Sequence, residues 1–308
     1  MLKNYIAPRL KPFVEVLSDN KKIYFFKRPG VAITLEDETG FIFSICKLMD
    51  GVKNLDELCR NLALSHPNET PYLIDLLRVL DNELLLEDIA RHDSENLTEY
   101  DVLRWSRNIE FFGAYTNALT NKYSLQKKIK STKVVLLGLG GVGSHILHSL
   151  AALGVETFRI IDFDKVELSN LNRQILYNES DVGKLKTRVA KKRLLQFSPH
   201  ANIKIFNEKI SCIENIERMV DGQDIVISAA DQPRDKIIDW VNAACIKKNV
   251  PFLCGALDSK WAIYYTVIPG KTGCIECWKT KAKKTGLIFQ DVMNQQGFIA
   301  ASALGCQI

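Results

Sequence analysis

The stretch that most constrains the fold runs from Lys133 to Asp164. An apolar, β-branched run leads into a glycine-rich turn, then a helix-period stretch, then a second apolar run that ends at Asp162. A strand, a glycine turn, a helix, a strand and an acid in this order typically hold a nucleotide, with phosphate on the turn and ribose on the acid. Glycine lets the backbone approach the phosphate, and the helix start offers free N–H groups. The cradle glycines would be Gly138, Gly140, Gly141 and Gly143. The alternative is a tight turn that binds nothing.

Strand and helix patterns alternate from Lys133 onward. Strands are expected at 157–161, 203–206, 224–228 and 251–254, and helices at 184–196, 213–220 and 234–247. This alternation predicts an α/β fold with a doubly wound, Rossmann-like sheet, which binds its ligands at the carboxyl ends of the strands. A longer, aromatic-rich strand at 262–268, followed by Pro269 and Gly270, predicts an antiparallel addition that makes the sheet mixed.

Residues 1–92 have the pattern of a small separate domain. Short strand patterns between residues 14 and 35 precede three helix patterns and a last strand at 84–86, which together describe a winged-helix-like module. Its expected helices carry few basic residues, so DNA binding is disfavoured. A groove for an extended or helical peptide, with strand addition at an open sheet edge, fits better. A purely structural role for the leucines of this module is the alternative.

Residues 93–132 are expected to form a helical lead-in to the nucleotide-binding domain at 133–308. Thr98 with Asp101 three residues later predicts a capped helix start. If that helix continues, Arg104 and Arg107 lie roughly on one face, from which they could project outward. The alternative is that both arginines are solvated surface residues.

Composition excludes several classes of function. The net charge of +5 is small and the basic residues are scattered, so no nucleic-acid partner is expected. The sequence has no signal peptide and no run of about 18 apolar residues, so a cytoplasmic protein without a membrane partner is expected. Eight irregularly spaced cysteines predict reduced thiols, of which only Cys274 and Cys277 have metal-ligand spacing.

Charged residues after the strand ends indicate which ligand the cradle takes. Asp162 is placed to accept hydrogen bonds from ribose, and Asp164 follows it. Arg173, in a polar loop, could hold a polyphosphate bidentately, and Lys186 could serve the phosphates as a point charge. Asp231 is a candidate Mg²⁺ ligand at a strand end. Together these groups favour attack on a nucleoside triphosphate over hydride transfer.

The motifs resemble those of the ThiF/MoeB/ubiquitin-activating adenylyltransferase superfamily over about residues 98–278. They are the segments 138–143, 162–164, 169–174, 182–186 and 230–231. The resemblance implies that Asp162 binds ribose, that Arg173 and Lys186 bind the triphosphate, and that Asp231 binds Mg²⁺. Asp164 and Asn170 would belong to the same nucleotide site.

Arg107 looks like the arginine that members of the superfamily send into the neighbouring subunit's phosphate site. This implies a homodimer that is obligatory for activity.

Within the superfamily, the MccB-like branch of microcin biosynthesis combines a similar leading domain with a similar segment at 269–277. Segments 48–51, 55–58 and 76–80 resemble the PqqD-like peptide-recognition domain. The resemblance implies attack of a precursor peptide's C-terminal carboxylate on the α-phosphate of ATP, or of CTP, because no residue is identified that reads the base. Pyrophosphate leaves, and a second step joins the nitrogen of the peptide's terminal asparagine to phosphorus. No protein nucleophile is required.

Two features depart from the superfamily pattern. Its structural zinc usually needs a second cysteine pair, whereas Cys274 and Cys277 are followed only by Cys306 near the last residue. Three explanations are open. The sequence is cut short, or Cys274 and Cys277 no longer bind zinc, or a ligand outside the cysteine pair completes the zinc site. The sheet would then lack its last strands. The loop that often receives substrate would lie around 278–297, and its polar part, 290–297, offers no clear nucleophile.

Two other functions remain open at this stage. One is adenylation of a ubiquitin-like sulfur-carrier protein ending in Gly-Gly, which the additional domain at residues 1–92 disfavours. The other is a non-catalytic scaffold that presents a peptide to a partner enzyme, against which the retained phosphate-binding residues argue.

Overall fold

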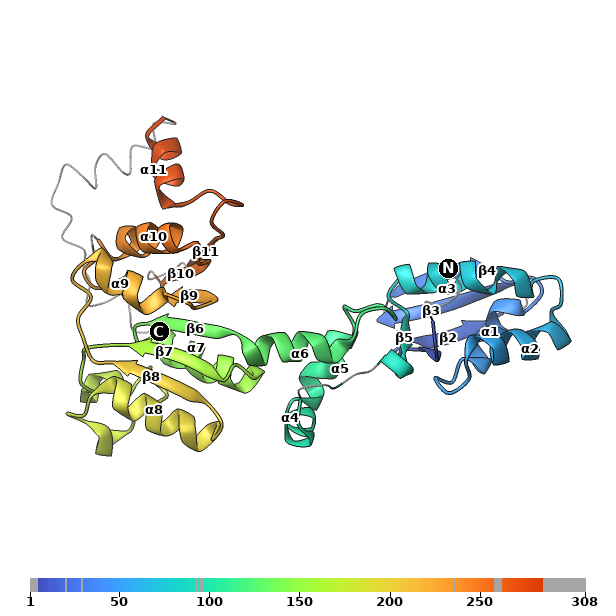
Figure 1. The fold of residues 1–308 in the computed structure, drawn as a ribbon, viewed down its shortest axis with the longest axis horizontal. Helices are drawn as coiled ribbons and strands as arrows, with labels where there is room; N and C mark the ends of the chain where they lie inside the picture. Colours follow the sequence, from blue (N-terminus) through green and yellow to red (C-terminus); the bar gives the residue numbers. More distant parts are fainter. Residues whose placement is uncertain are drawn as a thin grey trace. The chain divides into compact units, whose positions relative to one another are not determined.

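The computed structural model describes residues 5–19, 21–28, 30–91, 94, 97–234, 236–257 and 262–284. The chain forms two compact units, residues 1–128 and 129–308 (Figure 1). No helix in the described ranges combines the length and the apolar character that crossing a membrane requires. The three-part division of the sequence at residues 92 and 132 remains a prediction.

The N-terminal unit begins with the module expected at residues 1–92. Two antiparallel sheets form, one with the order β2-β3-β4 and one that pairs β1 with β5. The strands are β1 (Pro8–Leu10), β2 (Glu15–Ser18), β3 (Lys22–Arg28), β4 (Val31–Glu36) and β5 (Leu86–Asp88). The helices are α1 (Phe41–Leu48), α2 (Leu55–Ser65) and α3 (Leu73–Asn82), with a 3₁₀ turn at Thr70–Tyr72. Small antiparallel strands with three helices confirm this part of the fold prediction.

Local sequence explains these helices. Asn54 caps α2 by accepting from the Glu57 backbone N–H, and the Glu57 carboxylate accepts from the Asn54 N–H. Such a capping box contributes about 1 kcal/mol to helix stability. On α3, Leu73, Leu77 and Leu80 are buried, as their helical spacing predicts. They join strand and helix residues in a single apolar core.

The helix predicted from Thr98 is interrupted. Thr98 and Asp101 form the expected capping box, but α4 (Glu99–Arg104) ends at Trp105 and α5 (Ser106–Gly113) begins immediately after it. Trp105 is 2% exposed and its ψ of 21° departs from helical geometry. Arg104 and Arg107 therefore lie on different helices, and the expectation that they share one helical face was wrong, because the backbone leaves helical geometry at Trp105 between them.

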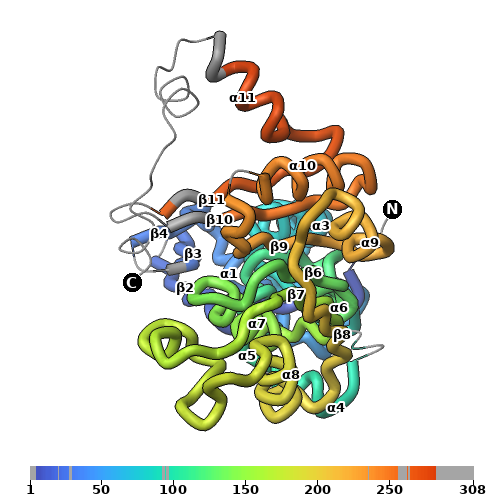
Figure 2. Tube along the Cα trace, turned by 90° about the vertical axis from the view of Figure 1, so that its left-hand side faces the viewer, coloured from blue at the N-terminus to red at the C-terminus, as the bar shows by residue number. Residues whose placement is uncertain are grey.

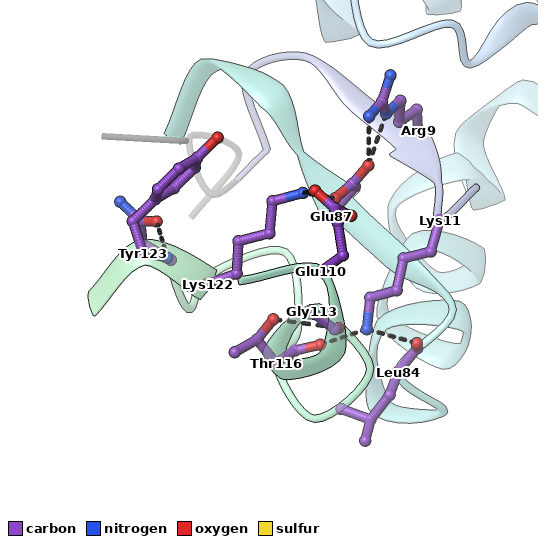
Figure 3. Close-up of polar contacts among 10 residues, drawn as sticks. Arg9, Lys11, Leu84, Glu87, Glu110, Gly113, Thr116, Lys122 and Tyr123 are labelled. Atoms are coloured by element: carbon purple, nitrogen blue, oxygen red, sulfur yellow. Dashed lines mark hydrogen bonds and ion pairs between the residues drawn. The ribbon is translucent and has the colours of Figure 1, made fainter. Parts of the chain in front are cut away.

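Ion pairs connect the β1–β5 pair to α5 and to α6 (Lys122–Ser131) (Figure 3). Arg9 on β1 pairs with Glu87 on β5 at 2.6 Å. The Lys122 ammonium lies 3.5 Å from the Glu87 carboxylate and 2.9 Å from that of Glu110 on α5. Since Lys122 and Glu87 are both buried, these contacts fix α5 within the N-terminal unit.

A buried lysine makes a second connection in the same region (Figure 3). The Lys11 ammonium donates to the backbone oxygen of Leu84 at 2.7 Å and to that of Thr116, which follows α5. Lys11 is 2% exposed, and burial lowers its pKa to about 8. The buried Lys11 ammonium thus holds the segment after α5 against the loop before β5.

The C-terminal unit is a six-stranded sheet with the order β11-β10-β9-β6-β7-β8. Its strands are β6 (Lys133–Leu137), β7 (Thr157–Ile161), β8 (Asn202–Phe206), β9 (Ile225–Ser228), β10 (Phe252–Leu257) and β11 (Ala262–Val267). All neighbours pair in parallel except β10 and β11, which are antiparallel. This confirms the predicted doubly wound, mixed sheet.

Helices cover both faces of this sheet (Figure 2). They are α7 (Gly141–Leu153), α8 (Lys186–Phe197), α9 (Ile213–Val220) and α10 (Ile237–Lys248), while α11 (Ile275–Lys284) contacts α10. Val134 and Leu136 of β6 join the apolar cluster containing α7 and α8 residues, whereas Val135 and Leu137 join the cluster containing α9 and α10 residues. A strand buried on both faces reads as an unbroken apolar run, as β6 does.

Candidate nucleotide-binding site

A cavity of about 720 Å³ lies at the carboxyl ends of the parallel strands. Residues from the glycine turn, from the ends of β7 and β9 and from the start of α8 line it. The predicted nucleotide-site residues that it brings together are Gly138, Gly140, Gly141, Asp162, Asp164, Asn170, Arg173, Lys186 and Asp231. Gly143, which was also predicted to belong to the nucleotide site, does not line the cavity.

The glycines of the turn have two different roles. Gly138 has a φ of 88°, and a Cβ there would lie 2.8 Å from the Ala229 backbone oxygen. A Cβ on Gly143 would lie 2.0 Å from the Gly138 oxygen, so these two glycines allow the turn to close against β9. A Cβ on Gly140 would meet nothing within 4 Å, and Gly140 caps α7. Gly140 therefore leaves open the space in front of the helix N-terminus, where an anion is stabilised.

Asp162 connects the glycine turn to the end of β7. Its Oδ2 accepts from the Leu139 N–H at 2.7 Å, and its Oδ1 accepts from the Asp164 N–H at 2.8 Å. Burial raises the pKa of the Asp162 carboxyl above its usual value, while the nearby Lys186 charge lowers it. An ionised carboxylate has about four acceptor positions, so two remain for ribose hydroxyls.

Lys186 and Asp164 form an ion pair at the edge of the cavity, with 2.9 Å between the ammonium and the carboxylate. Lys186 is 5% exposed, whereas the Asp164 side chain is 47% exposed. The Lys186 backbone N–H also donates to the Asp164 backbone oxygen at 3.0 Å. This hydrogen bond joins the start of α8 to the segment after β7. A positive charge is thus held in the cavity wall with one partner.

Arg173 lies beside the glycine turn without a carboxylate partner in the described residues. One of its terminal nitrogens donates to the Ser169 backbone oxygen and to Asn172 Oδ1, both at 2.9 Å. A Cβ on Gly141 would lie 3.4 Å from Arg173 Cγ, so the arginine stem runs along the turn. The guanidinium keeps donors available for a phosphate.

Asn170 is 6% exposed and supports the loop that carries Arg173. Its Oδ1 accepts from the Glu167 N–H at 3.1 Å, and its backbone oxygen accepts from the Arg173 and Gln174 N–H groups. The side-chain oxygen thus shapes the loop, and Asn170 lines the cavity as well.

Asp231 follows β9 and lines the cavity, directly after Ala229 and Ala230, whose backbone lies beside Gly138. It is exposed, and within the described ranges it makes no hydrogen bond or ion pair. Those ranges contain no cluster of three or more His, Cys, Asp or Glu that could hold a metal alone. Mg²⁺ is commonly bound by one or two carboxylates together with substrate phosphates, so Asp231 fits the role expected for it.

A family comparison agrees with this arrangement. The model of the ThiF family matches residues 106–303. The chain belongs to the ThiF family.

Individual relatives share the ThiF-type segment. The chain is 36% identical over 154 residues to the sulfur carrier protein ThiS adenylyltransferase of Bacillus subtilis, covering 49% of this chain and 45% of that protein. It is 30% identical over 182 residues to the vegetative HesA protein of Trichormus variabilis, covering 59% of this chain and 65% of HesA. The matches thus span less than two thirds of either relative.

Among solved structures, the chain is similar to E. coli MccB. The crystal structure of MccB with AMPCPP and MccA matches with a TM-score of 0.69 and 27% identity. The match covers 92% of this chain and 81% of MccB. Coverage this high includes most of the N-terminal unit as well as the ThiF-type sheet.

The cysteine pair of this ThiF-family chain lies at the start of α11. The two sulfurs, of Cys274 and Cys277, are 3.7 Å apart, and a hydrogen bond from the Cys277 backbone N–H lowers the pKa of the Cys274 thiol. Two thiolates on one tetrahedral Zn²⁺ lie about 3.8 Å apart. The pair fits two of the four zinc positions, the described residues supply no others, and Cys306 lies outside them, as does the predicted loop segment 290–297.

Arg107 lies on α5 of the N-terminal unit, with its side chain exposed. Its assignment to a neighbouring subunit's site stays a prediction.

The sequence pattern missed several residues of the site. The Tyr177 hydroxyl donates to the Leu139 backbone oxygen at 3.0 Å, so it holds the residue of the glycine turn whose N–H binds Asp162. Arg234 lines the cavity because α10 begins at Ile237 instead of at the predicted position 234. Glu208 and Tyr265 also line it. Tyr177 and Glu208 follow no helix or strand period, and only their position after a predicted strand or motif could have indicated them.

Proposed function

We propose that this chain is a nucleotidyltransferase that activates the C-terminal carboxylate of a short precursor peptide with ATP or CTP. The observation that carries the proposal is the single cavity into which Arg173, Lys186 and Asp231 converge around the glycine turn. A dehydrogenase needs the glycine turn and Asp162 but has no use for three further charged groups at the phosphates.

The reaction balances without a protein nucleophile. A lone pair on one carboxylate oxygen of the peptide forms a bond to the α-phosphorus, and the bond from that phosphorus to the bridging oxygen breaks. Its electron pair leaves on pyrophosphate, and no proton is transferred. The products are pyrophosphate and a peptide joined to the nucleoside monophosphate, from which a peptide-nucleotide can form.

Each residue has a defined task in this step. The N–H groups at the start of α7 and the Arg173 guanidinium bind the phosphates, and Lys186 adds a positive charge from the wall. Asp162 orients the ribose. Asp231 would hold Mg²⁺, which supplies positive charge to the triphosphate. Positioning and charge stabilisation suffice because phosphoryl chemistry of this kind needs little else from the protein.

The N-terminal unit favours a peptide as the acceptor. Both β2 and β4 are edge strands of the three-stranded sheet, which an extended peptide can join by main-chain hydrogen bonds. MccB, whose similarity extends over 92% of this chain, was crystallised with MccA. The similarity to the ThiS adenylyltransferase supports a sulfur-carrier protein as a second candidate acceptor.

Pyrophosphate release tests the proposal. The full chain would be incubated with ATP or CTP, Mg²⁺ and three acceptors: MccA, a pool of randomised short peptides with free C-termini, and a sulfur-carrier protein ending in Gly-Gly. Release with either peptide sample is the expected result, and Arg173→Ala should lower the rate by about 100-fold or more. Arg188→Ala, on the exposed surface of α8, is the control and should leave it unchanged.

Other outcomes have clear meanings. Release with the carrier protein alone would replace the peptide by the second candidate. Calorimetry showing peptide binding without nucleotide binding would identify a non-catalytic scaffold.

The homodimer expected from the family resemblance can be tested separately. Arg107 makes no hydrogen bond or ion pair within the described residues and is exposed, so it is available to a second subunit. If it serves the neighbour's site, equimolar mixing of Arg107→Ala and Arg173→Ala subunits creates one complete site in each mixed dimer. Two inactive variants should then recover about a quarter of wild-type activity. No recovery after confirmed subunit exchange would place Arg107 outside the site.

A further inference from the structure

The cavity extends past the strands that carry the predicted phosphate and ribose residues. Its lining continues from the ends of β7, β6 and β9 to Cys254 and Gly255 on β10 and to Tyr265 on β11. Five adjacent strands at a spacing of about 4.8 Å span roughly 19 Å. The glycine turn, Asp162 and Arg173 all lie on the β6–β7 side of the cavity. The part of the cavity beyond β9 therefore contains none of the residues proposed to bind the phosphates or the ribose.

The part beyond β9 has a different chemical character. Ile237 and Ile238 of α10 line it together with Cys254 and Tyr265. The Tyr265 hydroxyl is shielded from solvent and, within the described residues, lies beside the Cys254 thiol, a weak acceptor. Burial raises the pKa of the Tyr265 hydroxyl, so this group stays protonated and uncharged at neutral pH.

Arg234 is the basic residue at this part of the cavity. It lies in the loop between β9 and α10, three positions after Asp231, and its side chain is exposed. Within the described residues it makes no ion pair and no hydrogen bond. The other two basic residues of the lining are engaged, since Lys186 pairs with Asp164 and Arg173 donates to the Ser169 backbone oxygen. Arg234 alone offers its whole guanidinium fork to a ligand.

The proposed reaction needs such a group. A peptide carboxylate must approach a triphosphate of the same sign, next to Asp231, and without a cation the two anions repel each other. A planar guanidinium binds a carboxylate bidentately, which offsets the charge and orients the attacking oxygen. We propose that Arg234 binds the acceptor's C-terminal carboxylate in the part of the cavity beyond β9 and presents it to the α-phosphorus. This inference rests on the function proposed above.

A different use of Arg234 makes a different prediction. If the guanidinium held the departing pyrophosphate instead, its loss would weaken binding of the nucleotide or lower kcat. A carboxylate site, by contrast, affects the KM of the acceptor and leaves the KM of the nucleotide unchanged. The two roles therefore separate in steady-state kinetics.

The test uses the full chain and the individual peptide that supports the fastest pyrophosphate release. That peptide is made with a free C-terminal carboxylate and as its C-terminal amide. Arg234→Met removes the charge and keeps the stem, and Arg234→Lys restores a charge without the fork. Lys236→Met, two positions further along the same loop and not in the cavity lining, is the matched control.

The expected result is a rise of about tenfold or more in the acceptor KM of Arg234→Met, with the nucleotide KM within about twofold of wild type. Arg234→Lys should recover part of the loss, and Lys236→Met should behave as wild type. In binding assays with AMPCPP present, wild type should prefer the acid to the amide, whereas Arg234→Met should bind both equally.

A change confined to kcat or to the nucleotide KM would assign Arg234 to the departing pyrophosphate and so overturn the inference. Two further results would also overturn it. An unchanged acceptor KM and a retained preference for the acid in Arg234→Met would remove Arg234 from the acceptor site and leave the proposed function intact. A wild-type chain that releases no pyrophosphate with any acceptor would instead reject the proposed function, and the acceptor site with it.

Discussion

The Asp162 carboxylate accepts a hydrogen bond from the Leu139 backbone N–H at 2.7 Å, which joins the acid at the end of β7 to the glycine turn after β6. The Tyr177 hydroxyl binds the Leu139 backbone oxygen at 3.0 Å from a later loop. One backbone unit of the turn is thus held at both its N–H and its C=O. These two hydrogen bonds fix the position of the glycine turn, the proposed phosphate site, relative to Asp162, the proposed ribose ligand.

Replacing Asp162 by asparagine tests this double role. The amide keeps one acceptor oxygen but not two, so one of the two backbone N–H groups loses its partner, at a cost of about 1 kcal/mol in unfolding free energy. Because the ribose also loses an acceptor, ATP affinity should fall by about tenfold. Calorimetry with ATP and with inorganic triphosphate distinguishes the effects. Equal losses for both ligands would show that the turn itself, and not the ribose site, has been disturbed.

Gly140 and Gly143 should respond oppositely to the same added methyl group. The Cβ of Gly143→Ala would lie 2.0 Å from the Gly138 oxygen, so the turn must move, and we expect a loss of about 3 kcal/mol or more in stability. The Cβ of Gly140→Ala meets no atom within 4 Å and extends into the cavity. That variant should fold with a loss below about 1 kcal/mol and bind nucleotide at least about tenfold more weakly.

Thermal denaturation and nucleotide titration of both variants check this pair. A stable Gly143→Ala chain, or a Gly140→Ala chain with unchanged affinity, would contradict the division of the turn into packing and binding glycines.

The sequence predicted those features that local patterns control. A glycine turn between apolar runs has few structural solutions, so the turn itself, the position of Asp162 after β7 and the order of strands and helices followed from spacing. Arg234 was assigned to a helix that in fact starts at Ile237, because nothing in the local pattern marks the end of that loop. Burial of Trp105, which separates Arg104 from Arg107, depends on tertiary packing. The pairing of β1 with β5 likewise joins two three-residue strands distant in sequence.

Lys186 and Asp164 should not be equivalent on mutation, although they form one ion pair at 2.9 Å. Lys186→Met removes a buried charge and keeps most of the side-chain volume, so stability should change little, while pyrophosphate release should fall by about 100-fold. Asp164→Asn removes the hydrogen-bonded partner of the buried Lys186 and leaves only the nearby Asp162 carboxylate to offset its charge, which should cost about 1 to 2 kcal/mol, since Asp164 itself is partly exposed.

Urea denaturation and initial rates of both variants would reveal this asymmetry. Equal stability losses in the two variants would show that the pair contributes through mutual attraction and not through the burial of the lysine.

The last expectation concerns Lys11, which binds the backbone oxygens of Leu84 and Thr116 far from the cavity residues in sequence. Burial lowers its pKa from 10.5 to about 8, so the unfolded chain binds the proton more tightly than the folded chain does. Stability at pH below 8 therefore includes the full cost of burying the charge, and this cost is relieved as pH rises from about 8 to 10.5. The relief should reach about 3 kcal/mol.

Lys11→Met isolates this effect, because every other titrating group is common to both chains. The difference in unfolding free energy between wild type and Lys11→Met should shift in favour of wild type across the window from pH 8 to 10.5 and stay flat between pH 6 and 7.5. Urea denaturation at a series of pH values measures it. A constant difference across the whole range would mean that Lys11 keeps its ordinary proton affinity in the fold, and that its two carbonyl partners compensate fully for its burial.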